Sequence, residues 1–291
     1  MHLRKTLPPL IFFSGASSFP LFPYGNIKTA IAASCQELAQ WFGLPPILAN
    51  GEWSGWSNSY LNNRFVAHNA EVSSNAISSL TQRCKISFEE GVSAPPALLG
   101  DIAYFPTWSG AFVAYNYVTC QAVWQTNITA YLIEYGVPTV EQLSFIPVSS
   151  RTSPQIDQKQ NVLYAGSLLH ALLFAMDLRS GTILGQIPIN DHPLAIITQS
   201  PTFYNGKVFV GASSSEISVA SIPGYPCCNF TGNFGAYTFN RSTGTFARDW
   251  LVNSIENVVI GPGGWAGASV WGSQPSIDVQ RSQVFYGTGN M

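Results

Sequence analysis

The chain has 291 residues, of which 46% are hydrophobic and only 10% charged, and its formal net charge is −2. This length suffices for one large domain or two ordinary ones. A chain so close to neutral offers no electrostatic attraction for nucleic acid or acidic lipid, so we expect neither partner. No run of the sequence approaches the ~18 apolar residues of a membrane-spanning helix.

Residues 1–45 are expected to form a leader and a short helix. The start, "MHLRKTLPPLIFF", is basic and then apolar, as in a secretory signal, although prolines interrupt it. An ordinary apolar arm and a misassigned start codon are the alternatives. In residues 29–42 apolar side chains recur at helical spacing, and "GLPP" then ends the helix. Residues 46–291 are expected to form the second, larger unit.

Three glycosylation sequons begin at Asn127, Asn229 and Asn240. Each alone is a weak signal, because sequons arise by chance in a chain rich in Ser, Thr and Asn. Together with the cysteines they favour a secreted glycoprotein.

Five cysteines cannot all pair within the chain, and two of them, Cys227 and Cys228, are adjacent. Their Cα atoms can be at most ~3.8 Å apart, below the usual ~4.4–6.8 Å range of a disulfide. The two therefore close a strained ring with each other, pair separately with partners such as Cys84 or Cys120, or stay reduced.

A repeated layout of short strands begins after the first fifty residues. A strand of the form V-x-Y/F-x-G is followed by a polar turn and then by A-x-D/N and a glycine, so that Ala175 matches Ala114 and Gly181 matches Cys120. The copies span residues 101–124, 161–185, 207–250 and, for the first strand alone, 283–291.

Repeats of ~40–50 residues with several short strands predict an all-β fold made of propeller blades, with a β-sandwich as the alternative. About four blades form an open arc, and an open arc exposes sheet edges that ring closure would hide. We therefore expect an incomplete β-propeller: a fragment, a truncated gene product, or half of a larger ring.

Several motifs occur in the order found in one known family. They are "WSGWSNSYLNNRF" (53–65), "GVSAPPALLGDIAYFPTWSGAFVAYN" (91–116), "SSRTSPQID" (149–157), the stretch 191–216, "YPCCNFTG" (225–232) and the stretch 267–290. With these motifs the chain resembles the pyrroloquinoline-quinone (PQQ) dependent alcohol dehydrogenases, most of all the polyvinyl-alcohol-dehydrogenase-like branch. The resemblance implies a ring of eight four-stranded blades with PQQ and Ca²⁺ on its axis.

The resemblance also implies a metal site. Glu216 matches the carboxylate that binds calcium in the family, and Asn290 matches the side-chain amide ligand. Both are hard oxygen donors of the kind that Ca²⁺ prefers. The alternatives are a solvated loop carboxylate for Glu216 and a disordered residue for Asn290.

Further residues match those that hold PQQ in the family. Trp271 matches the indole on which the quinone stacks, Arg151 the guanidinium that pairs with a PQQ carboxylate, and Thr198 a hydroxyl that hydrogen-bonds a PQQ carboxylate. The small-residue loop beside that carboxylate corresponds to Ser213, Ser214 and Ser215. Packing between blades for the tryptophan, bonds to blade carbonyls for the arginine and a plain strand position for the threonine are the duller alternatives.

The chain departs from the family pattern at several points. "GVSAPP" stands where the first repeat commonly carries an acidic residue, and Thr231-Gly232 stands where the branch usually has Arg-Gly. The adjacent cysteines that cover PQQ in the family precede the arginine, and nothing before Arg151 reads Cys-Cys. We therefore do not assign Cys227 and Cys228 as cofactor contacts. No catalytic residue is assigned either, because the family's aspartate is expected beyond the C-terminus of this chain.

The function implied by the resemblance is oxidation of a small or polymeric alcohol by hydride transfer to PQQ, with Ca²⁺ as Lewis acid. Since no haem-attachment Cys-x-x-Cys-His occurs, electrons would pass to a separate acceptor. Whether the chain is itself an enzyme stays open. The alternatives are a non-catalytic secreted propeller for binding or scaffolding and a sugar-binding or sugar-cleaving propeller, although the few carboxylates argue against cleavage.

Overall fold

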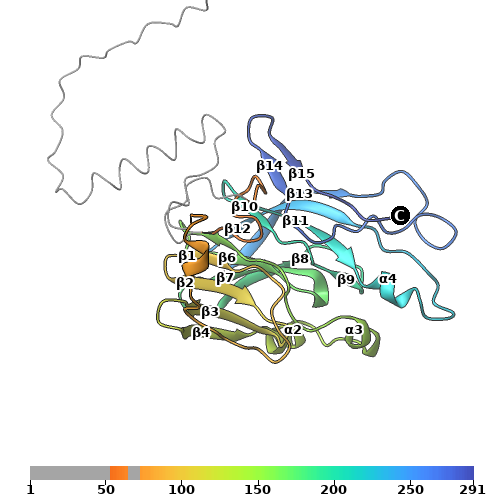
Figure 1. The fold of residues 1–291 in the computed structure, drawn as a ribbon. Coiled ribbons are helices and arrows are strands. Elements are labelled where there is room, and N and C mark those ends of the chain that lie inside the picture. Colours follow the sequence, from red (N-terminus) through yellow and green to blue (C-terminus); the bar gives the residue numbers. More distant parts are fainter. Residues whose placement is uncertain (1–52, 65–72) are drawn as a thin grey trace, which may run out of the picture. The chain divides into compact units, whose positions relative to one another are not determined.

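The computed structural model describes residues 53–64 and 73–291. The expected leader and the helix expected at 29–42 lie outside these residues. Within them, short antiparallel strands dominate, and they form successive sheets along the chain (Figure 1). The all-β architecture predicted from the repeats is confirmed.

The first two sheets are four-stranded meanders in which each strand pairs with the next in sequence. A short 3-10 helix, η1 (Ile77–Ser79), precedes them. The first meander contains β1 (Ala97–Leu99), β2 (Ile102–Pro106), β3 (Ala111–Asn116) and β4 (Gln121–Asn127). The second contains β5 (Gln155–Asp157), β6 (Val162–Gly166), β7 (Leu172–Asp177) and β8 (Ile183–Pro188), with the 3-10 helix η2 (Leu169–Ala171) between β6 and β7.

The third sheet repeats the meander with one additional strand, and a two-stranded sheet follows it. The third sheet contains β10 (Thr202–Tyr204), β11 (Lys207–Ser214), β12 (Asn233–Asn240) and β13 (Thr245–Asn253), and β9 (Ala195–Ile196) pairs with the end of β11. The last sheet consists of β14 (Ser276–Asp278) and β15 (Gln283–Phe285). The four strand starts expected from the repeats therefore all fall on strands.

Among the described residues, two short α-helices connect the first sheet to the second, and a third lies between β11 and β12 of the third sheet. They are α2 (Ile128–Tyr135), α3 (Val140–Phe145) and α4 (Glu216–Val219). Thr139 begins α3 with a capping box, because its hydroxyl accepts the Gln142 N–H while the Gln142 side chain accepts the Thr139 N–H. The side chain of Asn127 caps α2 in the same way by accepting the Ala130 N–H.

The repeated sheets also share an irregularity in their strand pairing. The register between the third and fourth strands shifts directly after Ala114, Ala175 and Ala236 in the three large sheets. The following turns contain Cys120 and Gly181, both with positive φ, at the positions matched in the sequence. The three large sheets therefore share a register shift after an alanine, and the first two also share the turn with positive φ, which confirms that the repeats are structural units.

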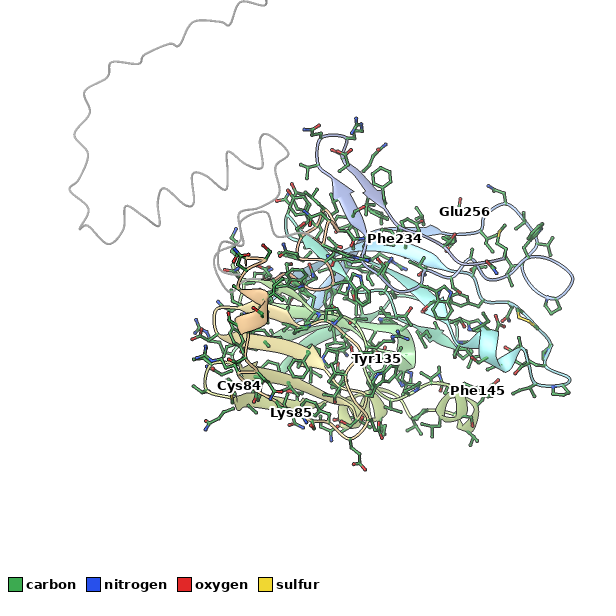
Figure 2. The ribbon with its side chains drawn as sticks, in the orientation of Figure 1. Cys84, Lys85, Tyr135, Phe145, Phe234 and Glu256 are labelled. Carbon is green, nitrogen blue, oxygen red and sulfur yellow. A yellow bond between two sulfur atoms is a disulfide. The ribbon has the colours of Figure 1, made fainter. Side chains whose placement is uncertain are left out.

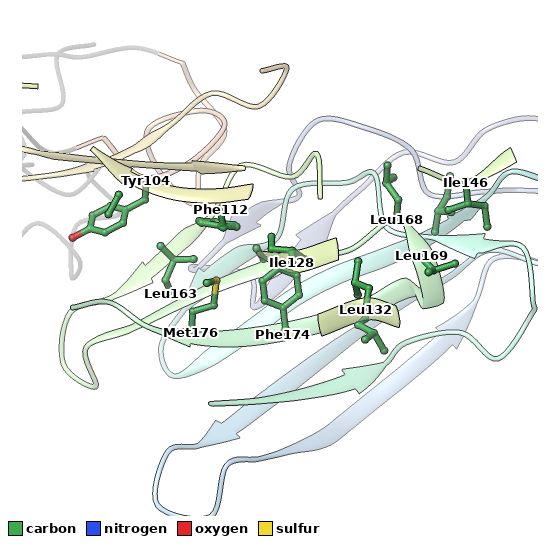
Figure 3. Packing of buried hydrophobic residues seen from close by; sticks show 14 of the residues in the cluster. Tyr104, Phe112, Ile128, Leu132, Ile146, Leu163, Leu168, Leu169, Phe174 and Met176 are labelled. Atoms are coloured by element: carbon green, nitrogen blue, oxygen red, sulfur yellow. The ribbon is translucent and has the colours of Figure 1, made fainter. Parts of the chain in front are cut away.

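The core lies between facing sheets. Phe112 of the first sheet packs at 84° against Phe174 of the second, and both are fully buried (Figure 3). On the opposite face of the second sheet, Tyr164 lies in a separate cluster with Val208 and Tyr237 of the third. Because strand side chains alternate between faces, β6 and β7 are apolar on both sides.

Polar contacts to the turn between β7 and β8 join the second sheet to the first. Trp124 Nε1 donates to the Leu178 carbonyl at 3.2 Å, and Thr126 Oγ1 donates to the Gly181 carbonyl at 2.7 Å. Gly181 has a φ of +73°, and a Cβ added to it would lie 2.5 Å from the Trp124 ring. Glycine is needed here both for its backbone conformation and for the approach of the indole.

The segment 53–64 contains none of the named strands but contacts the sheets. Trp53 exchanges two backbone hydrogen bonds with Leu98 of β1, at 3.1 and 2.8 Å. The Ser54 hydroxyl donates to Gln155 Oε1 of β5 at 3.4 Å. The segment therefore holds the first strands of two successive sheets.

The same segment continues to the third and fourth sheets. The Tyr60 ring lies 4.7 Å from that of Tyr204 at the end of β10, and the Tyr60 carbonyl accepts the Ile277 N–H of β14 at 2.8 Å. The Ser57 hydroxyl donates to Gln274 Oε1 at 3.1 Å. A stretch of twelve residues thus contacts the first strand of every sheet described here, so these strands converge on it.

We expect Gly181→Ala to lower the free energy of unfolding by about 2–3 kcal/mol, because it combines an unfavourable φ with a clash against Trp124. Gly206→Ala is the matched control: Gly206 has a φ of +78°, but a Cβ there meets nothing within 4 Å. Urea unfolding followed by fluorescence would measure both. Equal losses in the two variants would contradict the proposed contact.

Candidate functional site

A cavity of about 590 Å³ lies beside α4. Its walls come from α4, the loop before β12, and the segments before β14 and after β15. The residues that line it are Ser214, Glu216, Ile217, Ala220, Cys227, Cys228, Phe230, Ala266, Gly267, Ser269, Trp271, Gly289, Asn290 and Met291. The structure thus brings together four residues predicted from the sequence, namely Ser214, Glu216, Trp271 and Asn290.

Glu216 is a buried carboxylate that accepts three hydrogen bonds from the protein. It is the first residue of α4, 4% exposed, and its own N–H donates to the Ser214 hydroxyl at 3.0 Å. Its Oε1 accepts from the Tyr225 hydroxyl and from the Asn229 N–H, and its Oε2 accepts from the Phe230 N–H, each at 3.0 Å. The alternative of a solvated loop carboxylate is therefore wrong.

The serine loop that leads into α4 is held by backbone carbonyls. The hydroxyls of Ser214 and Ser215 both donate to the Leu194 carbonyl, at 3.0 and 3.3 Å. The Ser213 hydroxyl lies 3.3 Å from the Ile196 carbonyl. All three serines are buried, so these bonds satisfy groups that water cannot reach.

Thr198 connects this loop to the neighbourhood of the tryptophan. Its hydroxyl lies 2.9 Å from that of Ser213 and accepts the Gly272 N–H at 3.3 Å. Gly272 follows Trp271 directly. Thr198 therefore positions the backbone beside Trp271, although it is not itself among the described residues that line the cavity.

Trp271 separates two hollows. It lines the cavity already described and a second one of about 490 Å³, whose walls include Asn62, Gln199, Gln274 and the end of β15. Its side chain is 37% exposed, and a Cβ added to Gly289 would lie 3.0 Å from the indole Cδ1. An indole that borders open space on this scale is available to a ligand.

Backbone hydrogen bonds hold Asn290 at the cavity. Its carbonyl accepts the Ala268 N–H at 2.7 Å, and the Gly289 N–H donates to the Ser269 carbonyl at 2.8 Å. The segment after β15 is thereby held alongside residues 267–269. Asn290 is itself exposed.

Arg151 is placed elsewhere. Its guanidinium lies 5.6 Å from the centre of the Trp108 ring in the first sheet, and the residue is exposed. It is not among the described residues that line either cavity. Its assignment as a PQQ ligand stays a prediction.

The adjacent cysteines are bonded to each other. The structure contains the disulfides Cys227–Cys228 and Cys84–Cys120, so of the sequence-based alternatives the ring between neighbours is the one observed. Both members of the adjacent pair line the cavity that contains Glu216 and Trp271. Our expectation that the pair is not itself a cofactor contact stays a prediction.

Sequence reasoning also missed a polar network behind Glu216. His192 Nδ1 accepts the Leu194 N–H at 3.2 Å, so the neutral ring carries its proton on Nε2 and donates it to Asn229 Oδ1 at 2.8 Å. His192 Nε2 also lies 3.8 Å from Glu216 Oε1. His192 thereby contacts the loop that Glu216 binds.

The side chains that line the cavity can supply only some of the ligands of a hard cation. The described residues contain no cluster of three or more His, Cys, Asp or Glu side chains. A carboxylate has about four lone-pair directions, of which the three hydrogen bonds leave one on Oε2 of Glu216. Glu216 can therefore offer one oxygen without releasing its loop, and Asn290 can offer its amide oxygen from the same cavity.

Among solved structures, the chain resembles quinoprotein alcohol dehydrogenases. A europium-containing methanol dehydrogenase matches with a TM-score of 0.61 and 21% identity over 82% of this chain and 42% of its own. The quinohemoprotein alcohol dehydrogenase of Comamonas testosteroni matches with a TM-score of 0.62 and 18% identity over 90% of this chain and 39% of its own. The chain thus has the fold of part of a quinoprotein-type β-propeller.

In sequence, the chain is similar to a polyvinylalcohol dehydrogenase of a Pseudomonas species, with 26% identity over 261 residues. The match covers 85% of this chain but 37% of the relative, so the chain spans a little over a third of that protein's length. No family model matches the chain. The similarity in sequence and that in structure point to the same kind of protein.

Burial and the hydrogen bond to Glu216 raise the pKa of Tyr225 to about 12 from its ordinary value of 10.0. The folded state therefore keeps this proton between pH 10 and 12 while the unfolded state loses it. The stabilisation by Tyr225 is complete below pH 10 and disappears as the pH rises towards 12.

A pH titration of tyrosinate absorbance can test this expectation. The difference between the native protein and Tyr225→Phe should show one group that titrates near pH 12. A difference curve centred near pH 10 would contradict the contact with Glu216.

Proposed function

We propose that this chain is part of a PQQ-dependent alcohol dehydrogenase and that the cavity beside α4 binds the cofactor together with a calcium ion. The observation that carries this proposal is the placement of Trp271, Glu216 and Asn290 around one cavity. The similarity to a polyvinylalcohol dehydrogenase and the propeller fold support it.

The residues of the cavity have distinct tasks in this proposal. Trp271 offers a flat aromatic face against which a planar ring can stack. Glu216 and Asn290 offer oxygen atoms to Ca²⁺, for which hard oxygen ligands are suited. Thr198 fixes the turn after Trp271 through the Gly272 N–H, so that the indole keeps its orientation.

The chemistry that PQQ and Ca²⁺ supply when bound is acceptance of a hydride from the alcohol carbon, with the cation as Lewis acid. The alcohol proton requires a general base. Glu216 is the one carboxylate among the described residues that line the cavity, and its oxygens already accept three hydrogen bonds. We propose that the base is an aspartate that this chain does not contain.

The substrate in this proposal is an alcohol, small or polymeric, and electrons leave to a separate acceptor. The apolar side chains of Ile217, Ala220 and Met291 at the cavity wall suit a substrate with a hydrocarbon backbone.

No helix among the described residues is long and apolar enough to cross a membrane. We also propose secretion, since two disulfides are typical of an oxidising compartment.

Equilibrium dialysis of the purified chain against PQQ, with and without Ca²⁺, tests the proposed site. We expect Trp271→Ala to weaken PQQ binding about tenfold through loss of stacking, and Glu216→Gln to weaken its dependence on Ca²⁺. Trp250→Ala is the matched control, because Trp250 is 38% exposed and lies in β13, away from the cavity.

Two outcomes would contradict the proposed cofactor site. Absence of PQQ binding, or equal binding by the Trp271 and Trp250 variants, would remove the cofactor site. It would leave the non-catalytic propeller as the better description of this chain.

A further inference from the structure

The carboxylate of Glu216 binds both sides of the loop that contains the adjacent disulfide. Its hydrogen-bond donors are Tyr225, which precedes the cysteine pair, and Asn229 and Phe230, which follow it. These three bonds join α4 to the loop at each end of the disulfide. A single buried side chain thereby fixes a segment that contains neither helix nor strand.

The loop forms part of the cavity wall. Cys227 and Cys228 line the cavity together with Glu216 and Trp271. Cys227 is exposed and Cys228 half-buried, so a reagent from solvent can reach the pair. The position of this wall depends on the hydrogen bonds to Glu216.

We propose that residues 225–230 form a redox-sensitive latch on the cavity, which the Cys227–Cys228 disulfide closes and Glu216 anchors. A dithiol, small or carried by a protein, is the chemical class of partner that opens it. This role requires neither PQQ nor a metal ion, and it stands apart from the proposed dehydrogenase function.

The chemical step is ordinary thiol–disulfide exchange. A thiolate of the dithiol attacks one sulfur of the pair, the Cys227–Cys228 bond breaks, and the other cysteine leaves as a thiolate. The second thiol of the reagent then attacks the mixed disulfide, releases the remaining cysteine and becomes a cyclic disulfide. Two electrons pass from the dithiol to the pair, and the two cysteines end as thiols.

Glu216 controls this step by holding the loop closed. In Glu216→Gln the side-chain NH₂ group must face at least one of the three donors, so at least one hydrogen bond is lost. Tyr225→Phe removes one bond and leaves the carboxylate in place. Because bonds to a charged group are stronger than neutral ones, we expect either change to speed reduction of the pair about tenfold.

The other disulfide is a control within the same molecule. One cysteine of this disulfide, Cys84, is half-buried and the other, Cys120, is exposed, so its exposure resembles that of the adjacent pair. Neither Cys84 nor Cys120 lines the cavity that contains Glu216. The matched control variant is Glu134→Gln, which neutralises an exposed carboxylate on α2.

The experiment treats the full chain with dithiothreitol, alkylates the free thiols at intervals, and follows each cysteine by peptide mass spectrometry. We expect Glu216→Gln and Tyr225→Phe to accelerate modification of Cys227 and Cys228 while Cys84 and Cys120 react as in the native chain. Glu134→Gln should change neither rate. Equal rates at the adjacent pair in all variants, or equal acceleration of both disulfides, would overturn the anchoring role.

Hydrogen exchange tests the release of the wall itself. After selective reduction of the pair in the native chain, the amides of Asn229 and Phe230 should lose protection, because their acceptor is no longer held opposite them. Peptides from β11 should keep theirs. Unchanged protection at Asn229 and Phe230 after reduction would show that the loop stays in place, which would contradict the latch.

Discussion

Face-to-face packing of antiparallel meanders is the interaction on which the rest of this structure depends. The second sheet is buried on both faces, with Phe174 against the first sheet and Tyr164 against the third. A sheet of this kind cannot be stable alone, because both of its surfaces would face water. The stacking also determines where the first strands meet, and segment 53–64 contacts each of them.

The candidate site lies where this regular pattern is interrupted. The third sheet carries a long insertion between β11 and β12, and that insertion contains α4, the adjacent disulfide and the loop bound by Glu216. Figure 2 labels Phe234 on β12 of this sheet and Glu256 on the loop that follows β13. Insertions on a rigid scaffold can acquire binding groups without disturbing the core, and here the segment before β14 supplies Trp271.

The geometry around Glu216 permits both of the tasks that we propose for it. Three donors hold its carboxylate against the disulfide loop, and one lone-pair direction on Oε2 is left for a ligand. Its burial is tolerated because three donors form hydrogen bonds to the carboxylate. A side chain in this position links the shape of the cavity wall to whatever the cavity holds.

Much of the architecture was determined by local sequence. Alternating apolar residues, the repeated turns and the match of Ala175 to Ala114 predicted the strands and their order, because periodicity and turn chemistry act over a few residues. The sequence also brought Glu216, Trp271 and Asn290 forward as candidates through their resemblance to a known family.

Only the tertiary structure decided the rest: that Cys227 pairs with Cys228, that this pair shares a cavity with Trp271, and that Arg151 lies over Trp108 instead. Contacts between distant residues depend on how whole sheets stack, and no local pattern contains that information.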